Sequence, residues 1–233
     1  MKRRLASKLK LFLDRTYRSR SWVEPHVSVR LTGGLGNQLF IAATGLEQAT
    51  RLNLPLLLDD AETVRNIDRG YQLQGILPSA RRVSLVRSPH TWRERGFAYD
   101  ASINSILPGT RIEGYCQSWR YFTSVGKEIC QLIRGGEVDS APARIVVHVR
   151  RGDYLLPPHA DRHGLIGNEY FQRGVKVLRN RLGHLPVTIF SDDPVAAREI
   201  AVEIPNSSVA TSGEDECPLH VLRDMARGQG HVI

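Results

Sequence analysis

The stretch VSVRLTGGLGNQLFIAATGLEQATRLNLPLLLDD, residues 27–60, decides the fold class. Residues 27–31 alternate between apolar and polar side chains, a pattern typical of a half-buried strand. A glycine-rich loop follows at 32–38, and apolar residues then recur at helical spacing over 39–52. Residues 54–58 form a second, apolar strand-sized run. This order of strand, glycine loop, helix and strand predicts the start of an open parallel α/β sheet.

The same alternation of strands and helices returns in the second half of the chain. Residues 144–149 and 187–190 are strand-sized apolar runs, and apolar residues recur at helical spacing over 171–182. Toward the end of the chain we expect a strand at 207–210, a helix at 217–226 and a strand that begins at 231.

A polar segment rich in small residues, 134–143, separates the two α/β stretches and indicates a domain boundary. The region between residues 61 and 133 shows less regular periodicity. We therefore expect a basic amphipathic arm at 1–24, an N-terminal domain at 25–136 and a C-terminal domain at 141–233.

The composition is that of a soluble globular protein. Of the 233 residues, 41% are apolar and 24% are charged, which excludes a wholly disordered chain and a collagen. No apolar stretch reaches the roughly 18 residues that a bilayer-spanning helix needs. The three cysteines, Cys116, Cys130 and Cys217, are too widely spaced for a zinc site or a disulfide framework. A reducing, cytoplasmic environment fits this usage.

The net charge of +8 is concentrated in one segment. Residues 1–20 hold eight basic residues and one acidic residue, which accounts for +7 of the charge. Leucine and phenylalanine recur there at helical spacing, so the arm can form a basic amphipathic helix that lies on an anionic membrane surface or packs on the domain. Since the rest of the chain is nearly neutral, a nucleic-acid-binding function is disfavoured.

The glycine loop partly matches the dinucleotide-binding pattern. Gly34 and Gly36 fit the pattern, but Leu39 stands at the third glycine position. Asp59 and Asp60 follow the next strand, where a ribose ligand of a dinucleotide would lie. The alternatives are a phosphate site at the start of the following helix and a tight turn that needs glycine. In the first case the neighbouring residues 37 and 38, asparagine and glutamine, would hydrogen-bond a sugar or nucleotide.

Three basic residues, His148, Arg150 and Arg151, lie at the carboxyl end of the strand at 144–149. His148 and Arg150 would lie on one face of the strand and Arg151 on the other. Arginines at the carboxyl end of a parallel strand are typical of diphosphate binding, because guanidinium groups contact phosphate in a bidentate manner. Asp153 is either a general base or an ion-pair partner of Arg151.

Ser191, Asp192 and Asp193 end the strand at 187–190. The carboxylates of Asp192 and Asp193 could bind ribose, guanine or a metal. One of the two could instead cap a helix that begins at Pro194. Two adjacent carboxylates alone do not make a metal site.

Four motifs, taken together, resemble the α-1,2-fucosyltransferases of glycosyltransferase family 11. The motifs are GGLGNQLF at 33–40, GYCQSWRYF at 114–122, VHVRRGDY at 147–154 and FSDDP at 190–194. The resemblance covers about residues 27–233. It implies an α/β fold of two Rossmann-like domains, GT-B-like, the second incomplete at its C-terminus.

The resemblance also implies a metal-independent, inverting transferase without a cofactor. It would pass L-fucose from GDP-fucose to a galactose 2-hydroxyl of a glycan. Arg150 would clamp the diphosphate with support from His148 and Arg151, and Asp192 would lie near the nucleoside. The candidate residues are Arg150, Asp153 and His148 for catalysis; Asn37, Gly34, Gly36, Arg151, Asp192 and Ser191 for donor binding; and Gln117 on the acceptor side.

In the family, the strand that matches residues 231–233 continues into a serine-rich donor-binding motif that this sequence does not reach. We therefore expect a C-terminally truncated member with weakened donor binding, similar to bacterial members that build polysaccharide at the cytoplasmic membrane face. The alternatives are another sugar-nucleotide transferase and a non-catalytic sugar-nucleotide or glycan-binding remnant.

The basic arm predicts reversible membrane binding. The chain should float with anionic vesicles at low salt and dissociate as salt rises, because salt screens the attraction. A variant that lacks residues 1–20 is the control and should not float. Failure of the full chain to float at low salt would contradict the prediction.

Overall fold

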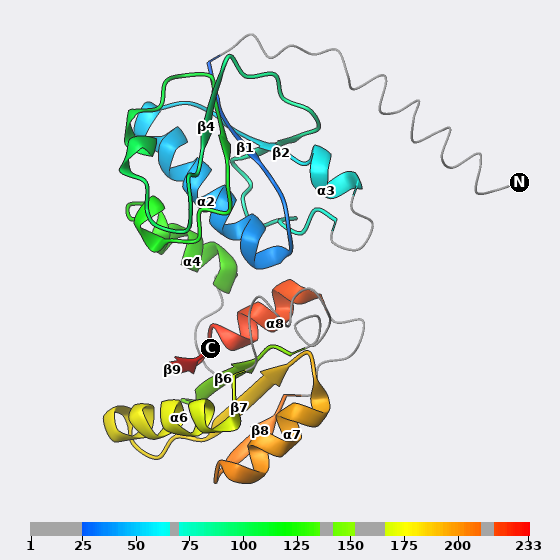
Figure 1. Ribbon diagram of the computed structural model, residues 1–233, viewed down its shortest axis with the longest axis vertical. Helices are drawn as coiled ribbons and strands as arrows, with labels where there is room; N and C mark the ends of the chain where they lie inside the picture. The colour runs from blue at the N-terminus through cyan, green and yellow to red at the C-terminus, as the bar shows by residue number, and fades with distance from the viewer. Residues whose placement is uncertain (1–24, 66–69, 136–141, 152–165, 211–216) are drawn as a thin grey trace, which may run out of the picture. The chain divides into compact units, whose positions relative to one another are not determined.

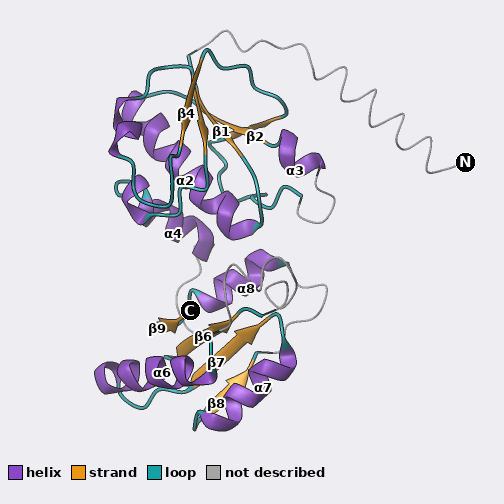
Figure 2. Ribbon diagram, viewed as in Figure 1, coloured by secondary structure: helices purple, strands orange, loops and turns teal. Residues whose placement is uncertain are grey.

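The computed structural model describes residues 25–65, 70–135, 142–151, 166–210 and 217–233. The chain divides into two compact units, Met1–Ile133 and Arg134–Ile233, here called the N-terminal and C-terminal units (Figure 1). Each unit is a parallel sheet with helices against it (Figure 2). This confirms the α/β fold with parallel sheets. The basic arm at 1–24 lies outside the described residues.

The N-terminal unit contains a five-stranded parallel sheet. Its strands are β1 (Val27–Arg30), β2 (Leu56–Asp59), β3 (Arg81–Val83), β4 (His90–Arg93) and β5 (Thr110–Glu113). They lie in the order β3-β2-β1-β5-β4. The order reverses between β1 and β5, so the loops that follow these two strands lie at the switch point of the carboxyl edge, where open α/β sheets bind ligands.

Helix α2 (Leu35–Leu52) packs its apolar side on one face of this sheet. A side chain in place of Gly45 would put its Cβ 2.4 Å from Val29 Cγ1 and 2.8 Å from Leu56 Cδ1, so glycine permits this close approach. The other helical segments of the unit are α3 (Ala61–Arg65), η1 (Ala101–Ser105), η2 (Trp119–Tyr121) and α4 (Gly126–Arg134).

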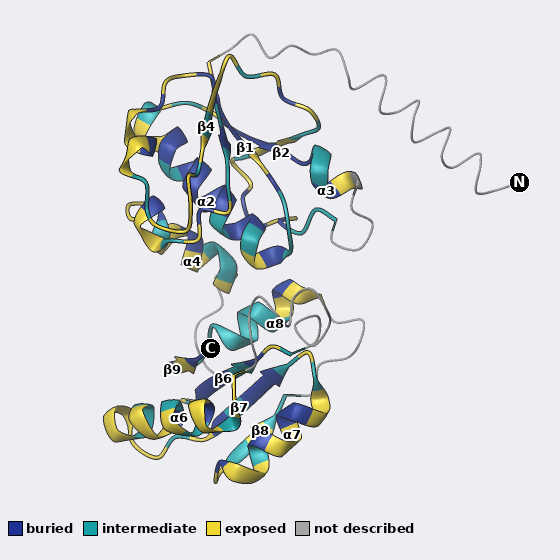
Figure 3. Ribbon diagram, in the orientation of Figure 1, coloured by how far each residue is buried: buried dark blue, intermediate teal, exposed yellow. Residues whose placement is uncertain are grey.

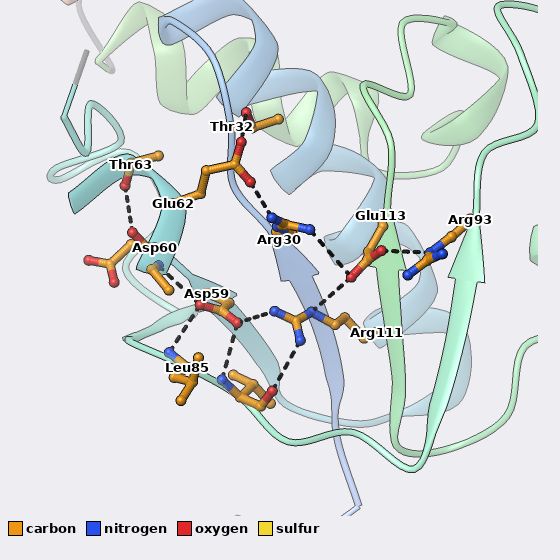
Figure 4. A network of polar contacts seen from close by, with 12 residues as sticks. Arg30, Thr32, Asp59, Asp60, Glu62, Thr63, Leu85, Arg93, Arg111 and Glu113 are labelled. Atoms are coloured by element: carbon orange, nitrogen blue, oxygen red, sulfur yellow. Dashed lines mark hydrogen bonds and ion pairs between the residues drawn. The ribbon is translucent and has the colours of Figure 1, made fainter. Parts of the chain in front are cut away.

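The opposite face of the sheet is crossed by residues 84–89, here called the strap, which lead from β3 at one edge to β4 at the other. Asp59 is fully buried and accepts hydrogen bonds from the strap amides of Leu85 and Val86, both 3.1 Å (Figure 4). Arg111 from β5 pairs with Asp59 at 2.6 Å and also donates to the Val86 carbonyl at 3.3 Å. A buried ion pair thus holds the strap where an α/β sheet commonly carries a helix.

The C-terminal unit contains a four-stranded parallel sheet. Its strands are β6 (Ile145–Val149), β7 (Val187–Ser191), β8 (Ser207–Val209) and β9 (Gly230–Val232), in the order β8-β7-β6-β9. Its helices are α6 (Asn168–Leu182), α7 (Pro194–Glu203) and α8 (Pro218–Met225). The strands and helices expected after residue 144 are therefore confirmed.

The core of the C-terminal unit lies between the sheet and two helices. Figure 1 shows α6 and α7 on one side of the sheet and α8 on the other. Ile145, Val147 and Val149 of β6 pack with Phe171 of α6 and Ile200 of α7, and β6 and β7 are mostly dark blue, that is buried, in Figure 3. Residues 146 and 148 consequently point to the face that α8 occupies.

None of the described helices is both long and apolar enough to cross a membrane.

The buried Asp59 predicts a large stability effect in the N-terminal unit. Asp59→Ala should lower the free energy of unfolding by about 3–5 kcal/mol, because it leaves Arg111 and two strap amides without their buried partner. Denaturant unfolding measures the change. Glu62→Ala is the control: Glu62 pairs with Arg30 at 2.8 Å but is 42% exposed, so the loss should be below about 1 kcal/mol. Equal losses in the two variants would contradict the prediction.

Candidate functional site

One candidate region, here called the N-terminal region, lies at the carboxyl edge of the N-terminal sheet, where the loops after β1 and β5 meet. Gln117 from the second loop donates its Nε2 hydrogen to Oδ1 of Asn37 at 2.7 Å. The structure therefore brings together two residues that the sequence analysis singled out and that lie 80 positions apart. Gln117 is exposed and Asn37 half-buried, so both can be reached from solvent.

Gly33 is the glycine in this loop that the conformation requires. Its φ is +72°, and a Cβ there would lie 2.4 Å from Nδ2 of Asn37. Gly34 immediately precedes α2, and Gly36 lies in its first turn. A Cβ at either position would have no neighbour within 4 Å, so the surface above them is open. Their donor-binding role stays a prediction.

Gln38 is not available to a ligand, in contrast to the expectation from sequence. It is fully buried, and its Nε2 donates to the carbonyls of Gly33 at 2.9 Å and Gly70 at 2.8 Å. Its Oε1 accepts from the amide of Gln72 at 3.0 Å. Gln38 instead joins the glycine loop to the segment at 70–72.

The two aspartates at the carboxyl end of β2, Asp59 and Asp60, are also bonded within the fold. Asp59 carries the strap, and Asp60 pairs with Arg82 and Ser84. Both carboxylates are at most 1% exposed. A ribose therefore finds no free carboxylate here, which disfavours the dinucleotide interpretation of the glycine loop.

A second candidate region, here called the C-terminal region, lies at the carboxyl ends of β6 and β7 in the C-terminal unit. The sheet order places β6 between β7 and β9, so its carboxyl end lies at a topological switch point. Asp192 Oδ1 accepts a hydrogen bond from the backbone amide of Arg151 at 2.8 Å. This bond fixes the chain just after His148 and Arg150.

The side chain of Arg151 is oriented by α6. Its Nη2 donates to Oδ1 of Asn168 at 2.9 Å, and Asn168 is the first residue of that helix. No sequence motif marks Asn168 as a candidate site residue, because its contact with Arg151 depends on how α6 packs against β6. The structure thus adds Asn168 to the candidate residues, as a positioning residue.

Asp192 and Asp193 have different partners. Asp193 caps α7 by accepting from the amides of Val195 at 3.0 Å and Ala196 at 3.1 Å. Ser191 Oγ accepts from the amide of Asp193 at 2.9 Å. The helix cap that the sequence assigned to one of the two carboxylates therefore belongs to Asp193, and Asp192 faces the loop after β6. The donor-binding roles of Ser191 and Asp192 stay predictions.

His148 is half-buried beside two charged groups. Burial lowers its pKa below the usual 6.5; the Asp192 carboxylate raises the pKa and the Arg150 guanidinium lowers it, both to a lesser extent. At neutral pH the imidazole is therefore uncharged, with one nitrogen that donates and one that accepts. This electrostatic coupling indicates that His148, Arg150 and Asp192 lie close together.

Asp153, the predicted base, lies outside the described residues. Within the described part of the chain, no three His, Cys, Asp or Glu side chains are grouped so that they could hold a metal ion. The expectation of a metal-independent reaction stays a prediction.

Comparison with known proteins identifies the family. Residues 113–226 match the model of glycosyl transferase family 11, and these residues contain the loop after β5 and the strands β6 and β7. This match and the relatives described next support membership of glycosyl transferase family 11. The sequence resemblance is thereby confirmed.

Three known proteins are similar to this chain. An α-1,2-colitosyltransferase of Escherichia coli is 27% identical over 199 residues, with 72% of this chain and 69% of the relative covered. The O-antigen biosynthesis glycosyltransferase WbnK of Escherichia coli is 32% identical over 88 residues, which cover 37% of this chain and 29% of that protein. The fucosyltransferase NodZ from Bradyrhizobium aligns at a TM-score of 0.48 and 13% identity, over 88% of this chain and 84% of that structure.

The lowered pKa of His148 predicts a pH dependence of stability. In the unfolded chain His148 binds a proton near pH 6.5, whereas the folded unit resists protonation until lower pH. The unfolded state thus binds more protons in this window, so the free energy of unfolding of the C-terminal unit falls as pH drops below about 7. His148→Gln should remove this part of the slope.

The same pKa can be followed directly by NMR titration of the imidazole. Asp192→Asn should lower the pKa of His148 further, and Arg150→Ala should raise it, because these neighbours act in opposite directions. Shifts of the same sign in the two variants would contradict the geometry described above.

Proposed function

We propose that this chain transfers L-fucose from GDP-fucose to a galactose 2-hydroxyl of a glycan, with inversion and formation of an α-1,2 linkage. The observation that carries the proposal is the cluster of His148, Arg150 and Asp192 at the carboxyl ends of β6 and β7, in a chain of family 11. A cationic group at a switch point suits the diphosphate of a sugar nucleotide.

Arg150 is the proposed diphosphate clamp. It is exposed at the end of β6, and its guanidinium keeps its charge at any working pH. Two parallel N–H donors can bind two phosphate oxygens. Since negative charge develops on the β-phosphate as the sugar departs, the same contact stabilises the transition state more than the bound substrate.

Arg151 and His148 have supporting roles in the proposal. The Asp192–amide bond and the Asn168 contact hold Arg151 in one geometry before substrate arrives. His148, uncharged at neutral pH, can donate a hydrogen bond to a phosphate oxygen. Preorganised donors of this kind need no rearrangement during the reaction.

In the proposed step, the oxygen of the acceptor hydroxyl attacks C1 of fucose from the face opposite GDP. The bond between C1 and the β-phosphate oxygen breaks, the electron pair leaves with GDP, and the hydroxyl proton passes to a base. Asp153 is the proposed base. The transfer needs no cofactor, and we expect it to proceed without a metal ion.

The loops of the N-terminal unit complete the proposal. Asn37, with Gly34 and Gly36, is proposed to face the donor, and Gln117 to face the acceptor. The hydrogen bond between Asn37 and Gln117 supports this assignment, because a donor sugar and an acceptor hydroxyl that react must lie side by side, and so must the groups that would bind them. A GT-B-like arrangement of the two units and peripheral membrane binding through residues 1–20 are parts of the same proposal.

A second donor is favoured by one comparison, the alignment with a protein named α-1,2-colitosyltransferase. Colitose is the 3-deoxy form of fucose, so the same diphosphate clamp would hold both GDP-sugars. The ratio of kcat/KM for the two donors distinguishes them. A site that hydrogen-bonds the 3-hydroxyl rejects the deoxy sugar by a factor on the order of 10⁴, whereas a site that ignores this hydroxyl accepts both.

The clamp predicts the effect of one substitution on nucleotide binding. Calorimetric titration of the full chain should show binding of GDP and GDP-fucose and none of UDP. Arg150→Ala should weaken GDP binding by about 100-fold, because one bidentate charge-assisted contact contributes roughly 3 kcal/mol. Turnover of GDP-fucose with a galactoside then separates a transferase from a protein that only binds sugar nucleotides.

Arg181→Ala is the matched control for the clamp. It removes an equal charge from an exposed position in the last turn of α6, in the same unit. Its GDP affinity should be that of the wild type. If both variants bind GDP as the wild type does, Arg150 is not the clamp.

A further inference from the structure

Two large aromatic side chains near Gln117 in the N-terminal region are left outside the core. Tyr115, in the loop after β5, is 44% exposed, and Trp119, the first residue of η2, is 70% exposed. The aromatic rings around them are paired with one another instead. Those pairs are Trp92 with Tyr121, Tyr99 with Tyr121, and Phe40 with Phe122. Exposed rings next to a candidate site indicate a contact surface for a ligand.

The backbone that carries Tyr115 is held in place from β4. Glu94, the residue after that strand, accepts hydrogen bonds from the amides of Tyr115 and Cys116 through one oxygen, both at 2.9 Å. Gly114 has a φ of +152°, and a Cβ there would lie 2.5 Å from the Cβ of Glu94. The loop thus follows the Glu94 side chain closely, and Tyr115 projects from a fixed turn.

Trp119 also stands on a fixed support. The amide of Ser118 donates to the Cys116 carbonyl at 2.8 Å, which closes a tight turn just before η2. At the other end of η2, the ring of Phe122 meets the ring of Phe40 edge to face, with centroids 5.6 Å apart. Phe40 belongs to α2, so η2 is attached to the main helix of the unit.

The polar groups between the two aromatic residues are uncharged. Gln117 lies between them in sequence and donates to Asn37. Among the described residues, Gln117 Oε1 and Asn37 Nδ2 have no hydrogen-bond partner, which leaves one acceptor and one donor at the surface. Aromatic faces beside neutral amides complement a pyranose ring, since it presents an apolar C–H face and hydroxyl groups that both donate and accept.

We propose that Trp119 and Tyr115 form a stacking platform for a sugar ring of the acceptor glycan, with Gln117 bound to one of its hydroxyls. The platform deepens the proposed function, because it names the residues that hold the acceptor. Binding of a galactoside to the platform can nevertheless be measured without any transfer.

The test is a titration of the full chain with methyl β-D-galactoside and with lactose, followed by NMR of the ring protons and by tryptophan fluorescence. Trp119→Ala should weaken galactoside binding roughly tenfold, or about 1.4 kcal/mol at 25 °C, and should raise the acceptor KM by a similar factor. Tyr115→Ala should have a smaller effect in the same direction. GDP binding and GDP-fucose hydrolysis should be unchanged in both variants.

Phe97→Ala is the matched control, because Phe97 is 92% exposed in the same unit but lies in the segment after β4. It should leave galactoside binding unchanged, and Trp119→Phe should retain most of it. These two results separate a specific platform from a general loss of exposed aromatic surface.

The outcomes distinguish this inference from the proposed function. If GDP binds and Trp119→Ala keeps full galactoside affinity, the platform is refuted and the donor proposal stands. If GDP does not bind but a galactoside binds in a Trp119-dependent manner, the platform stands and the transferase proposal fails. If wild-type chain binds no galactoside and Trp119→Ala abolishes self-association instead, the surface is a contact between copies and the platform is refuted.

Discussion

The parallel direction of the described strands is the constraint on which the two candidate regions depend. In each unit it places the loops that follow the strands at one edge, and open α/β sheets bind ligands where the strand order reverses. Asn37 and Gln117 meet for this reason, although neither belongs to a strand. The same reason brings Asp192 against the backbone of Arg151. The sheet topology alone thus places the polar and charged side chains of each region at one edge of the sheet.

Carboxylates bound to backbone amides then fix the loops that topology has gathered. Asp59 holds the strap, Glu94 holds the turn before Gln117, and Asp192 holds the chain at Arg151. Charged acceptors make stronger hydrogen bonds to amides than neutral acceptors do, which suits segments without regular structure. Each candidate region therefore includes a short loop whose backbone is held by a side chain from a neighbouring strand end.

The sequence predicts those helices and strands whose apolar residues recur at regular spacing. Both faces of β6 and β7 are apolar over most of their length, and the motif at 27–60 combines two apolar strands with a regular helix, so these elements were expected. β3 and β4 were not expected, because edge strands with exposed arginine, histidine and threonine show no alternation. The partners of Glu94 and Asn168 were equally hidden, since each bond joins segments that only the fold brings together. The cap at Asp193 needed geometry to separate it from Asp192.

The bond between Asp192 and the Arg151 amide has a consequence for how this protein can diversify. The Asp192 side chain holds the loop that carries Arg150 and Arg151, and it is also proposed to lie near the nucleoside of the donor. A substitution there therefore affects both roles at once. Substitutions at Asp192 would alter nucleotide preference and loop geometry together, so few of them would yield a working variant. Among the described residues, the hydroxyl of Ser191 is bonded within its own turn, to the amide of Asp193. A library that seeks new donor specificity should therefore keep position 192 constant and vary its neighbour.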